Sequence, residues 1–289
     1  MQNINSTPMK NRVNAALVIM LGIMLSSVSC TNTNRAERTP IQYTDYNQQT
    51  DLHGNTEAEV SACVNRVMKC IANGDARQFA SLVVYPLSRT YPLKDIENEK
   101  QMIAYFDTMF DDSIRNIMRH ATKDNWFNGG WRGYGFDNGL IWVSPNSSSK
   151  PVTSVNYMSA KERALLEKTI KEDVASLHRS LQKKGLRPIM CLQDSVNGSI
   201  LRIDRMGKDG APYRLVLYGK DKNLSGAPDV CVNGTLEIQG SMGVRNYTFK
   251  DRQTTYEFDS YSYLLHISVA GEEKEQHELV TCYWSDLIK

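Results

Sequence analysis

The sequence lacks the short motifs that mark the common catalytic and cofactor sites. It contains no Gly-x-Ser-x-Gly elbow, no phosphate-binding loop, no His-Glu-x-x-His and no Cys-x-x-Cys. The five histidines are scattered, and no two of them have the spacing of metal ligands. The cluster Gly130, Gly133 and Gly135 lacks the preceding strand and following helix that dinucleotide binding needs. We therefore expect no metal and no cofactor.

An excess of charge of either sign is also missing. The 289 residues include 34 Lys and Arg against 32 Asp and Glu, a net charge of +2. Lys10 and Arg12 account for this difference, and residues 1–29 contain no acid. A neutral surface argues against nucleic-acid binding, which requires a basic stripe, and against recruitment to anionic lipid by charge alone. We expect no nucleic-acid partner.

No apolar run is long enough to cross a bilayer. The run from Ala15 to Leu25 is shorter than the roughly 20 residues that a spanning helix needs. Lys10 and Arg12 precede it, and small residues lead from it to Cys30. This order is typical of an export signal. We expect residues 1–29 to be a signal peptide that directs the chain out of the cytoplasm.

The end of this signal resembles the lipobox of bacterial lipoproteins. In that family the signal is cut before a Cys, and the Cys then carries the lipids. Ser29 suits the position before the cut, whereas Ser27 stands where the family usually has Leu. The resemblance implies lipidation of Cys30, a membrane anchor and a place in the cell envelope, facing the periplasm or the exterior. The alternative is ordinary secretion with a structural Cys30.

Five cysteines remain beyond Cys30, so they cannot all pair with one another. Cys63 and Cys70 lie in one predicted helix, about 10 Å apart along its axis at roughly 1.5 Å per residue, too far for a disulfide. We expect them to be small buried side chains. Cys191, Cys231 and Cys282 allow one disulfide in an oxidising envelope, and the sequence does not choose the pair.

The remaining chain predicts an α+β protein in four segments. Residues 30–55 are polar and predict a flexible tether. Residues 56–158 combine helical periodicity with short strands, and residues 159–185 predict a linking helix that ends near Gly185. Thr56 with Glu59, and Ser159 with Glu162, have the spacing of capping boxes at helix starts. Residues 186–289 predict strands only, separated by Asn-Gly and Asp-Gly turns, with alternation such as Leu201 and Ile203 against Arg202 and Asp204. Short strands at this spacing are typical of an antiparallel β-barrel or sandwich.

The first folded segment has a familiar order of elements. Two helices and a Tyr-Pro-Leu segment precede a helix containing Met102–Asp107 and Phe110, and strands around Gly135 and Gly139–Val143 follow. From about residue 56 to 157 this order resembles the NTF2-like domains of bacterial envelope proteins. The resemblance implies a curved sheet wrapped on helices, with a pocket that is catalytic in some members and binds or is filled in many. The long helix that follows departs from the simplest pattern of that family.

An aromatic group is the best candidate for such a pocket. The candidate lining residues are Trp126, Trp131, Tyr134, Phe136 and Trp142. Alternate strand residues share a face, so Tyr134 and Phe136 are expected to point together at the concave side. Trp N–H and Tyr O–H groups can orient a ligand within an apolar pocket. The competing interpretation is a core layer between sheet and helices.

Catalysis from this pocket would need a carboxylate or His with a shifted pKa. Four residues lie nearby in sequence, and each has a simpler expected role: Asp107, Asp112, His120 and Asp124. We predict no catalytic residue and a non-enzymatic module that binds a ligand or an envelope protein. One alternative is a small-molecule enzyme that uses the NTF2-like pocket.

The second alternative is an inhibitor of a cell-wall hydrolase. An exported small β-barrel on a lipoprotein resembles the membrane-bound lysozyme inhibitors, although their Ser-rich inhibitory loop has no clear counterpart here. The β segment also carries tyrosines that could form an exposed recognition face. These are Tyr247, Tyr256, Tyr261 and Tyr263.

Overall fold

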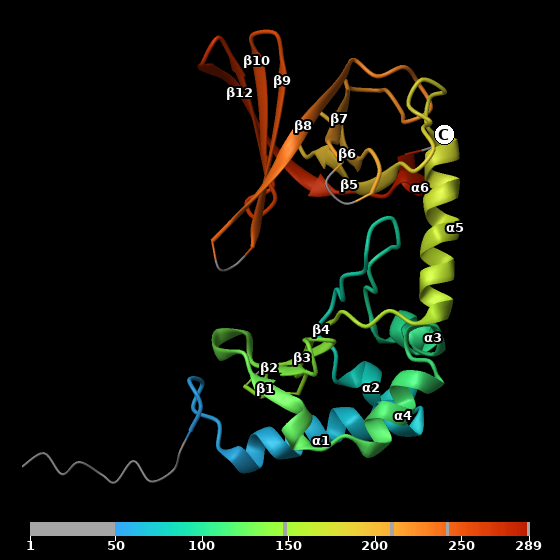
Figure 1. Cartoon of the computed structure of the whole chain (residues 1–289), viewed down its shortest axis with the longest axis vertical. Helices are drawn as coiled ribbons and strands as arrows, with labels where there is room; N and C mark the ends of the chain where they lie inside the picture. Colours follow the sequence, from blue (N-terminus) through green and yellow to red (C-terminus); the bar gives the residue numbers. More distant parts are fainter. Residues whose placement is uncertain (1–49, 147–148, 209–210, 241–242, 288–289) are drawn as a thin grey trace, which may run out of the picture. The chain divides into compact units, whose positions relative to one another are not determined.

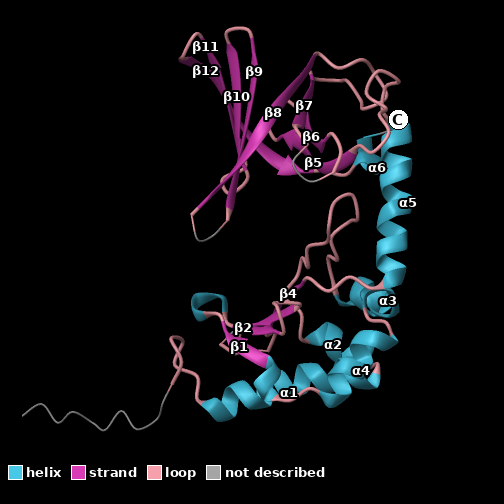
Figure 2. Cartoon of the chain, viewed as in Figure 1, coloured by secondary structure: helices cyan, strands magenta, loops and turns pink. Residues whose placement is uncertain are grey.

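A computed structural model describes residues 50–146, 149–208, 211–240 and 243–287 (Figure 1). The protein is α+β, with helices around a small antiparallel sheet followed by a closed antiparallel barrel (Figure 2). Among the described residues, none of the helices has both the length and the apolar character that crossing a bilayer requires. The predicted signal peptide, Cys30 and most of the predicted tether lie outside these residues.

The first part of the described chain packs four helices against a sheet of order β1-β2-β3-β4. Its helices are α1 (Glu57–Asn73), α2 (Ala76–Ser81), α3 (Glu99–Met109) and α4 (Asp112–His120). Its strands are β1 (Trp126–Asn128), β2 (Tyr134–Phe136), β3 (Ile141–Val143) and β4 (Val152–Val155). Two short 3-10 turns flank β1, at Lys123–Asn125 and Gly130–Arg132. The apolar faces of the helices and one face of the sheet form a single core.

Local signals fix the helix ends in this part. Thr56 and Glu59 form a complete capping box, and Gly74 ends α1 with a left-handed φ of 71° that glycine adopts without strain. The N-cap of α4 is Asp111, because its carboxylate accepts the Ile114 N–H, and Asp112 is the first residue inside the helix.

Helix α5 (Ala160–Ser176) is shorter than the predicted linking helix and ends well before Gly185. The Gln182 side chain donates to the carbonyls of Ala175 (3.0 Å) and Leu177 (2.7 Å), which caps the last turn. Beyond α5, Leu177 and Leu181 pack in a core cluster with residues of β5, β6 and β7. Burial of these leucines against the barrel replaces continuation of the helix.

Eight strands form the barrel in the order β10-β11-β12-β5-β6-β7-β8-β9, and β9 pairs with β10 to close it. They are β5 (Arg187–Asp194), β6 (Ile200–Arg205), β7 (Tyr213–Tyr218), β8 (Val230–Gln239), β9 (Val244–Asp251), β10 (Thr254–Asp259), β11 (Leu264–Val269) and β12 (Glu272–Thr281). The predicted antiparallel domain is thus a barrel. One short helix, α6 (Trp284–Leu287), follows it and was not expected from the sequence.

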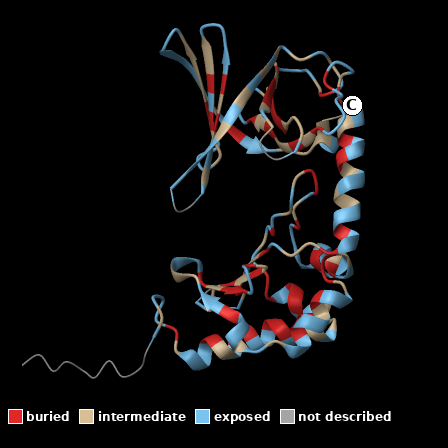
Figure 3. Ribbon diagram, viewed as in Figure 1, coloured by how far each residue is buried: buried red, intermediate tan, exposed pale blue. Residues whose placement is uncertain are grey.

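Strand β6 is buried on both of its faces (Figure 3). Leu201 and Ile203 point into the barrel core, and Arg202 and Asp204 point outward. The outward pair is nevertheless fully buried, because Asp173 of α5 lies against it. The apolar residues of β6 therefore face the barrel core, and its charged residues face a buried polar layer between the barrel and α5.

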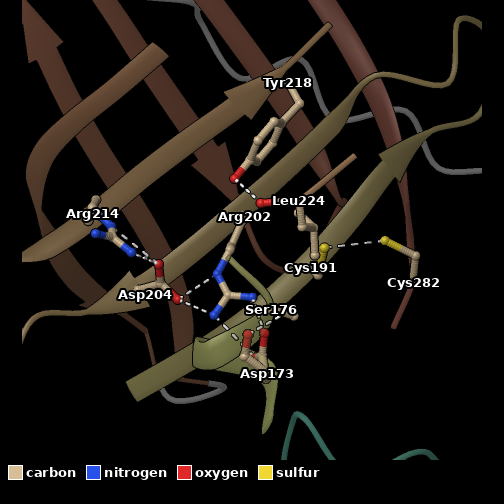
Figure 4. Close-up of polar contacts among 9 residues, drawn as sticks. All are labelled: Asp173, Ser176, Cys191, Arg202, Asp204, Arg214, Tyr218, Leu224 and Cys282. Atoms are coloured by element: carbon tan, nitrogen blue, oxygen red, sulfur yellow. Dashed lines mark hydrogen bonds and ion pairs between the residues drawn. The ribbon is translucent and has the colours of Figure 1, made fainter. Parts of the chain in front are cut away.

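A buried ionic cluster joins α5 to the barrel (Figure 4). Arg202 Nη1 and Nη2 donate to the two Asp173 carboxylate oxygens at 2.6 and 3.1 Å, and Arg202 Nε donates to Asp204 at 2.8 Å. Arg214 donates to Asp204 Oδ2 at 2.6 Å and to the Leu181 carbonyl at 3.0 Å. Burial disfavours the charge of Arg202, but Asp204 and Asp173 raise its pKa further, so it stays protonated.

The same helix is fixed to the first part through Glu162. Its carboxylate accepts Arg89 Nε at 2.8 Å and Arg89 Nη2 at 2.7 Å, and it is fully buried. Glu162 and Asp173 are 11 residues apart, about three turns at roughly 3.6 residues per turn, so they lie on one face of α5. Because Glu162 binds Arg89, the predicted capping box with Ser159 forms only in half: Ser159 accepts the Glu162 N–H.

We expect Arg202→Met to lower the free energy of unfolding by about 3–5 kcal/mol, because it leaves the Asp173 carboxylate buried without its cation. Adding Asp173→Leu should restore part of this loss, because both charges are then gone. Urea unfolding of the single and double variants measures both effects. Glu172→Ala is the control, since its pair with Lys168 is exposed and its removal should change stability by less than about 0.5 kcal/mol. Equal stability of Arg202→Met and wild type would contradict the prediction.

Candidate functional site

The five predicted pocket residues do not line a single cavity. Trp126 and Phe136 pack together in the helix-facing core, with ring centroids 5.2 Å apart, and Tyr134 shares their face. Trp142 lies on the opposite face, where its ring meets Phe127. Trp131 is 65 % exposed. Part of the group is a core layer, and a ligand-binding role stays a prediction.

Trp126 and Tyr134 also line a smaller pocket of about 410 Å³ at the edge of this sheet. The Tyr134 hydroxyl donates to Asp51 at 3.0 Å, and burial together with this carboxylate raises the pKa of Tyr134 to about 12. Trp126 Nε1 is buried and has no hydrogen-bond partner among the described residues. The four acid–base candidates Asp107, Asp112, His120 and Asp124 are all exposed and do not line this pocket.

A larger, mostly apolar groove of about 790 Å³ lies elsewhere. Its walls come from the segment 92–97, from α3 and α5, and from the residues after β12. The aromatic side chains in it are Tyr105, Tyr283 and Trp284. We call it the C-terminal groove, because Tyr283–Asp286 form one of its walls. None of these residues was predicted as part of a site. The sequence feature that could have indicated the groove is the aromatic pair Tyr283 and Trp284, directly after the last strand.

Polar contacts hold the walls of the C-terminal groove together. The Asp95 N–H donates to the Tyr283 hydroxyl at 2.9 Å, and Lys94 Nζ pairs with Asp286 at 2.7 Å. Lys94 Nζ also lies 5.4 Å from the centre of the Tyr283 ring. Tyr283 in turn stacks on Tyr91, with centroids 6.2 Å apart. The wall formed by the chain end is therefore positioned by the segment 92–97.

Helix α3 contributes two polar side chains to the groove, Gln101 and Tyr105. The Tyr105 hydroxyl donates to Glu162 at 3.1 Å, within the buried contact that Glu162 makes with Arg89. Burial and the neighbouring Glu162 carboxylate raise the pKa of Tyr105, so the phenol stays protonated at any physiological pH. The groove thus offers aromatic and apolar contacts beside the charged side chains of Lys94, Asp95, Glu97 and Asp286, and neither His nor Cys is among its lining residues.

The open end of the barrel forms a third hollow, of about 430 Å³. Its aliphatic wall is Ile200, Leu201, Leu217, Val230, Leu265, Ile267 and Leu279. At its rim His277 Nδ1 lies 2.6 Å from Asp194 and Nε2 lies 3.0 Å from Glu275. Both ring nitrogens are engaged, so His277 has no free nitrogen for proton transfer in this arrangement.

No protein-family model, no curated protein and no solved structure matches this chain. The geometry and the residues of the chain itself therefore carry the functional inference.

His277 should make stability depend on pH. Burial opposes its charge, but hydrogen bonds to Asp194 and Glu275 outweigh burial and raise its pKa above the ordinary 6.5. The stabilisation is complete below about pH 6.5, and it is lost as the pH rises through the raised folded pKa. Asp194 keeps its negative charge down to low pH, because hydrogen bonds from backbone N–H groups and His277 outweigh burial and lower its pKa.

We therefore expect His277→Gln to lower Tm by on the order of 2–4 °C at about pH 5 and by much less at about pH 9. Circular dichroism melts across this range measure the difference from wild type. His120→Gln, at an exposed position on α4, is the control and should show no such trend. A Tm difference for His277→Gln that does not change with pH would contradict the assignment.

Proposed function

We propose that this protein is a non-enzymatic binding module of the bacterial cell envelope, anchored by lipid on Cys30, and that its ligand occupies the C-terminal groove. The observation that carries the proposal is the groove itself. Its volume of about 790 Å³ is within the roughly 300–1,000 Å³ typical of ligand pockets. Its exposed lining is mainly apolar and aromatic, and polar side chains such as Lys94, Gln101 and Asp286 are present to orient a ligand.

The groups around the groove favour binding over catalysis. The Tyr105 hydroxyl is committed to Glu162, and Lys94 is paired with Asp286. Asp95 accepts the Arg89 N–H at 2.7 Å. Among the lining residues, the Ser285 hydroxyl donates to the Asp286 carboxylate at 3.4 Å, but both residues are exposed and this carboxylate is already paired with Lys94. Covalent catalysis requires a base that is available to activate the nucleophile.

The shape of the groove favours a compact ligand with a flat apolar part. Tyr105, Tyr283 and Trp284 supply ring faces, and such faces stack on aromatic or other planar groups. The proposal includes an NTF2-like ancestry for the first part, supported by its antiparallel sheet packed on helices. In this arrangement the ligand lies away from the strands β1–β4, against α3 and α5.

Filling the groove should abolish binding of an apolar probe. Ala104 lines the groove from α3, so Ala104→Trp places an indole inside it. Ile103 is the preceding residue of the same helix, is 40 % exposed and lies outside the groove, so Ile103→Trp is the matched control. Anilinonaphthalene sulfonate is titrated onto the mature chain with Cys30→Ser, and its saturable fluorescence gives the affinity. We expect Ala104→Trp to weaken this affinity at least 10-fold and Ile103→Trp to leave it unchanged.

Two outcomes of this titration would overturn the groove as the binding site. One is unchanged affinity in Ala104→Trp, and the other is equal weakening by Ile103→Trp. Far-ultraviolet circular dichroism on both variants confirms that the fold is retained.

The anchor has its own test. Cys30→Ala should move the protein from the membrane fraction to the soluble fraction of expressing cells and should abolish incorporation of labelled palmitate. Several acyl chains, each contributing about 0.8 kcal/mol per buried methylene, would otherwise hold it in the membrane almost permanently. Cys231→Ala is the control, because Cys231 is an exposed thiol in β8. Retention of Cys30→Ala in the membrane fraction would refute the lipid anchor.

A further inference from the structure

Two thiols meet where the barrel closes. Cys191 in β5 and Cys282 just after β12 have their sulfur atoms 3.5 Å apart (Figure 4). The Cys282 N–H also donates to the Cys191 carbonyl at 3.0 Å. Leu192 and Thr281 are the last paired residues of β5 and β12, so the two cysteines extend this ladder by one position.

This position suits a covalent bond. Residues opposite each other in antiparallel strands have Cα atoms about 4.5–5.5 Å apart. Disulfides span Cα separations of about 4.4–6.8 Å, so rotation of the two side chains is sufficient to form the bond. The other described cysteines lie elsewhere: Cys63 and Cys70 are buried in α1, and Cys231 is exposed on β8.

We propose that Cys191 and Cys282 form a disulfide when the protein meets a disulfide oxidant, and that this bond secures both the barrel seam and the wall of the C-terminal groove. The structure thereby selects one of the pairs that the sequence left open. Cys282 is half-buried and Cys191 is fully buried, so the external oxidant reaches Cys282 first.

The chemistry balances with a low-molecular-weight disulfide such as oxidised glutathione. The Cys282 thiolate attacks one glutathione sulfur, forms a mixed disulfide and releases one glutathione thiolate. The Cys191 thiolate then attacks the Cys282 sulfur and expels the second glutathione. The two protein thiols lose two protons and two electrons, and glutathione disulfide is reduced to two thiols.

The bond would act where the barrel is held least. Strands β12 and β5 share three residue pairs, whereas β5 and β6 share six. Tyr283–Asp286, the chain-end wall of the groove, begins one residue after Cys282. A covalent link at this point closes a loop of 91 residues and fixes the start of that wall.

The test is a disulfide map of the full mature chain with Cys30→Ser. After incubation with oxidised glutathione the protein is unfolded without reductant, alkylated, digested and analysed by mass spectrometry. We expect one linked peptide pair containing Cys191 and Cys282, lighter by two hydrogen atoms than the reduced pair, with Cys231 alkylated. Alkylation of both Cys191 and Cys282, or a link from either to Cys231, would overturn the proposal.

A second measurement does not depend on the variants folding equally well. The oxidised wild type should melt on the order of 10 °C above the same protein in dithiothreitol, given the length of the closed loop. Cys231→Ser should keep this difference, and Cys282→Ser should lose it. An identical Tm in the oxidised and reduced wild type would refute a bond that secures the seam. Neither measurement involves a groove ligand, so a negative result in either would refute the disulfide without bearing on the proposed function.

Discussion

Two buried carboxylates on one face of α5 are the constraint on which the described structure depends. Glu162 binds Arg89 of the first part, and Asp173 binds Arg202 of the barrel. Each carboxylate and its partner are withdrawn from water, so neither charge is tolerable without the other. The helix is therefore held at both ends by pairs that cannot be released one member at a time.

This constraint explains features that look unrelated. Because Asp173 covers the outer face of β6, that strand is buried on both sides and carries two charges in its interior. Because Glu162 also accepts the Tyr105 hydroxyl, the same anchor orients a polar group at the C-terminal groove. The Glu162 carboxylate thus serves both the packing of α5 and the groove. A ligand in the groove would contact Tyr105, whose hydroxyl this carboxylate holds.

The sequence predicted whatever depends on near neighbours. The caps at Thr56 and Ser159, the antiparallel strands after Gly185 and the alternation of Leu201 with Arg202 all follow from local spacing, whereas the choice of a barrel over a sandwich does not. It did not predict partners far apart in the chain: Arg89 and Glu162 are 73 residues apart, and their pairing diverts Glu162 from its expected cap. The groove escaped prediction for the same reason, since its walls come from four separate segments.

The aromatic group shows how a correct period gives an incomplete site. Period two placed Tyr134 and Phe136 on one face, and the structure keeps them there. The strand period does not indicate what covers that face. In the structure the helices cover it, so Trp126 and Phe136 are core residues, while Trp142 lies on the opposite face. By contrast Tyr283 and Trp284 have no periodic signal and lie exposed to a hollow, because the chain end is fixed by Asp95 and Lys94 rather than by a ladder. The shape of the C-terminal groove is therefore set by long-range polar contacts, whereas strand periodicity alone locates only core residues.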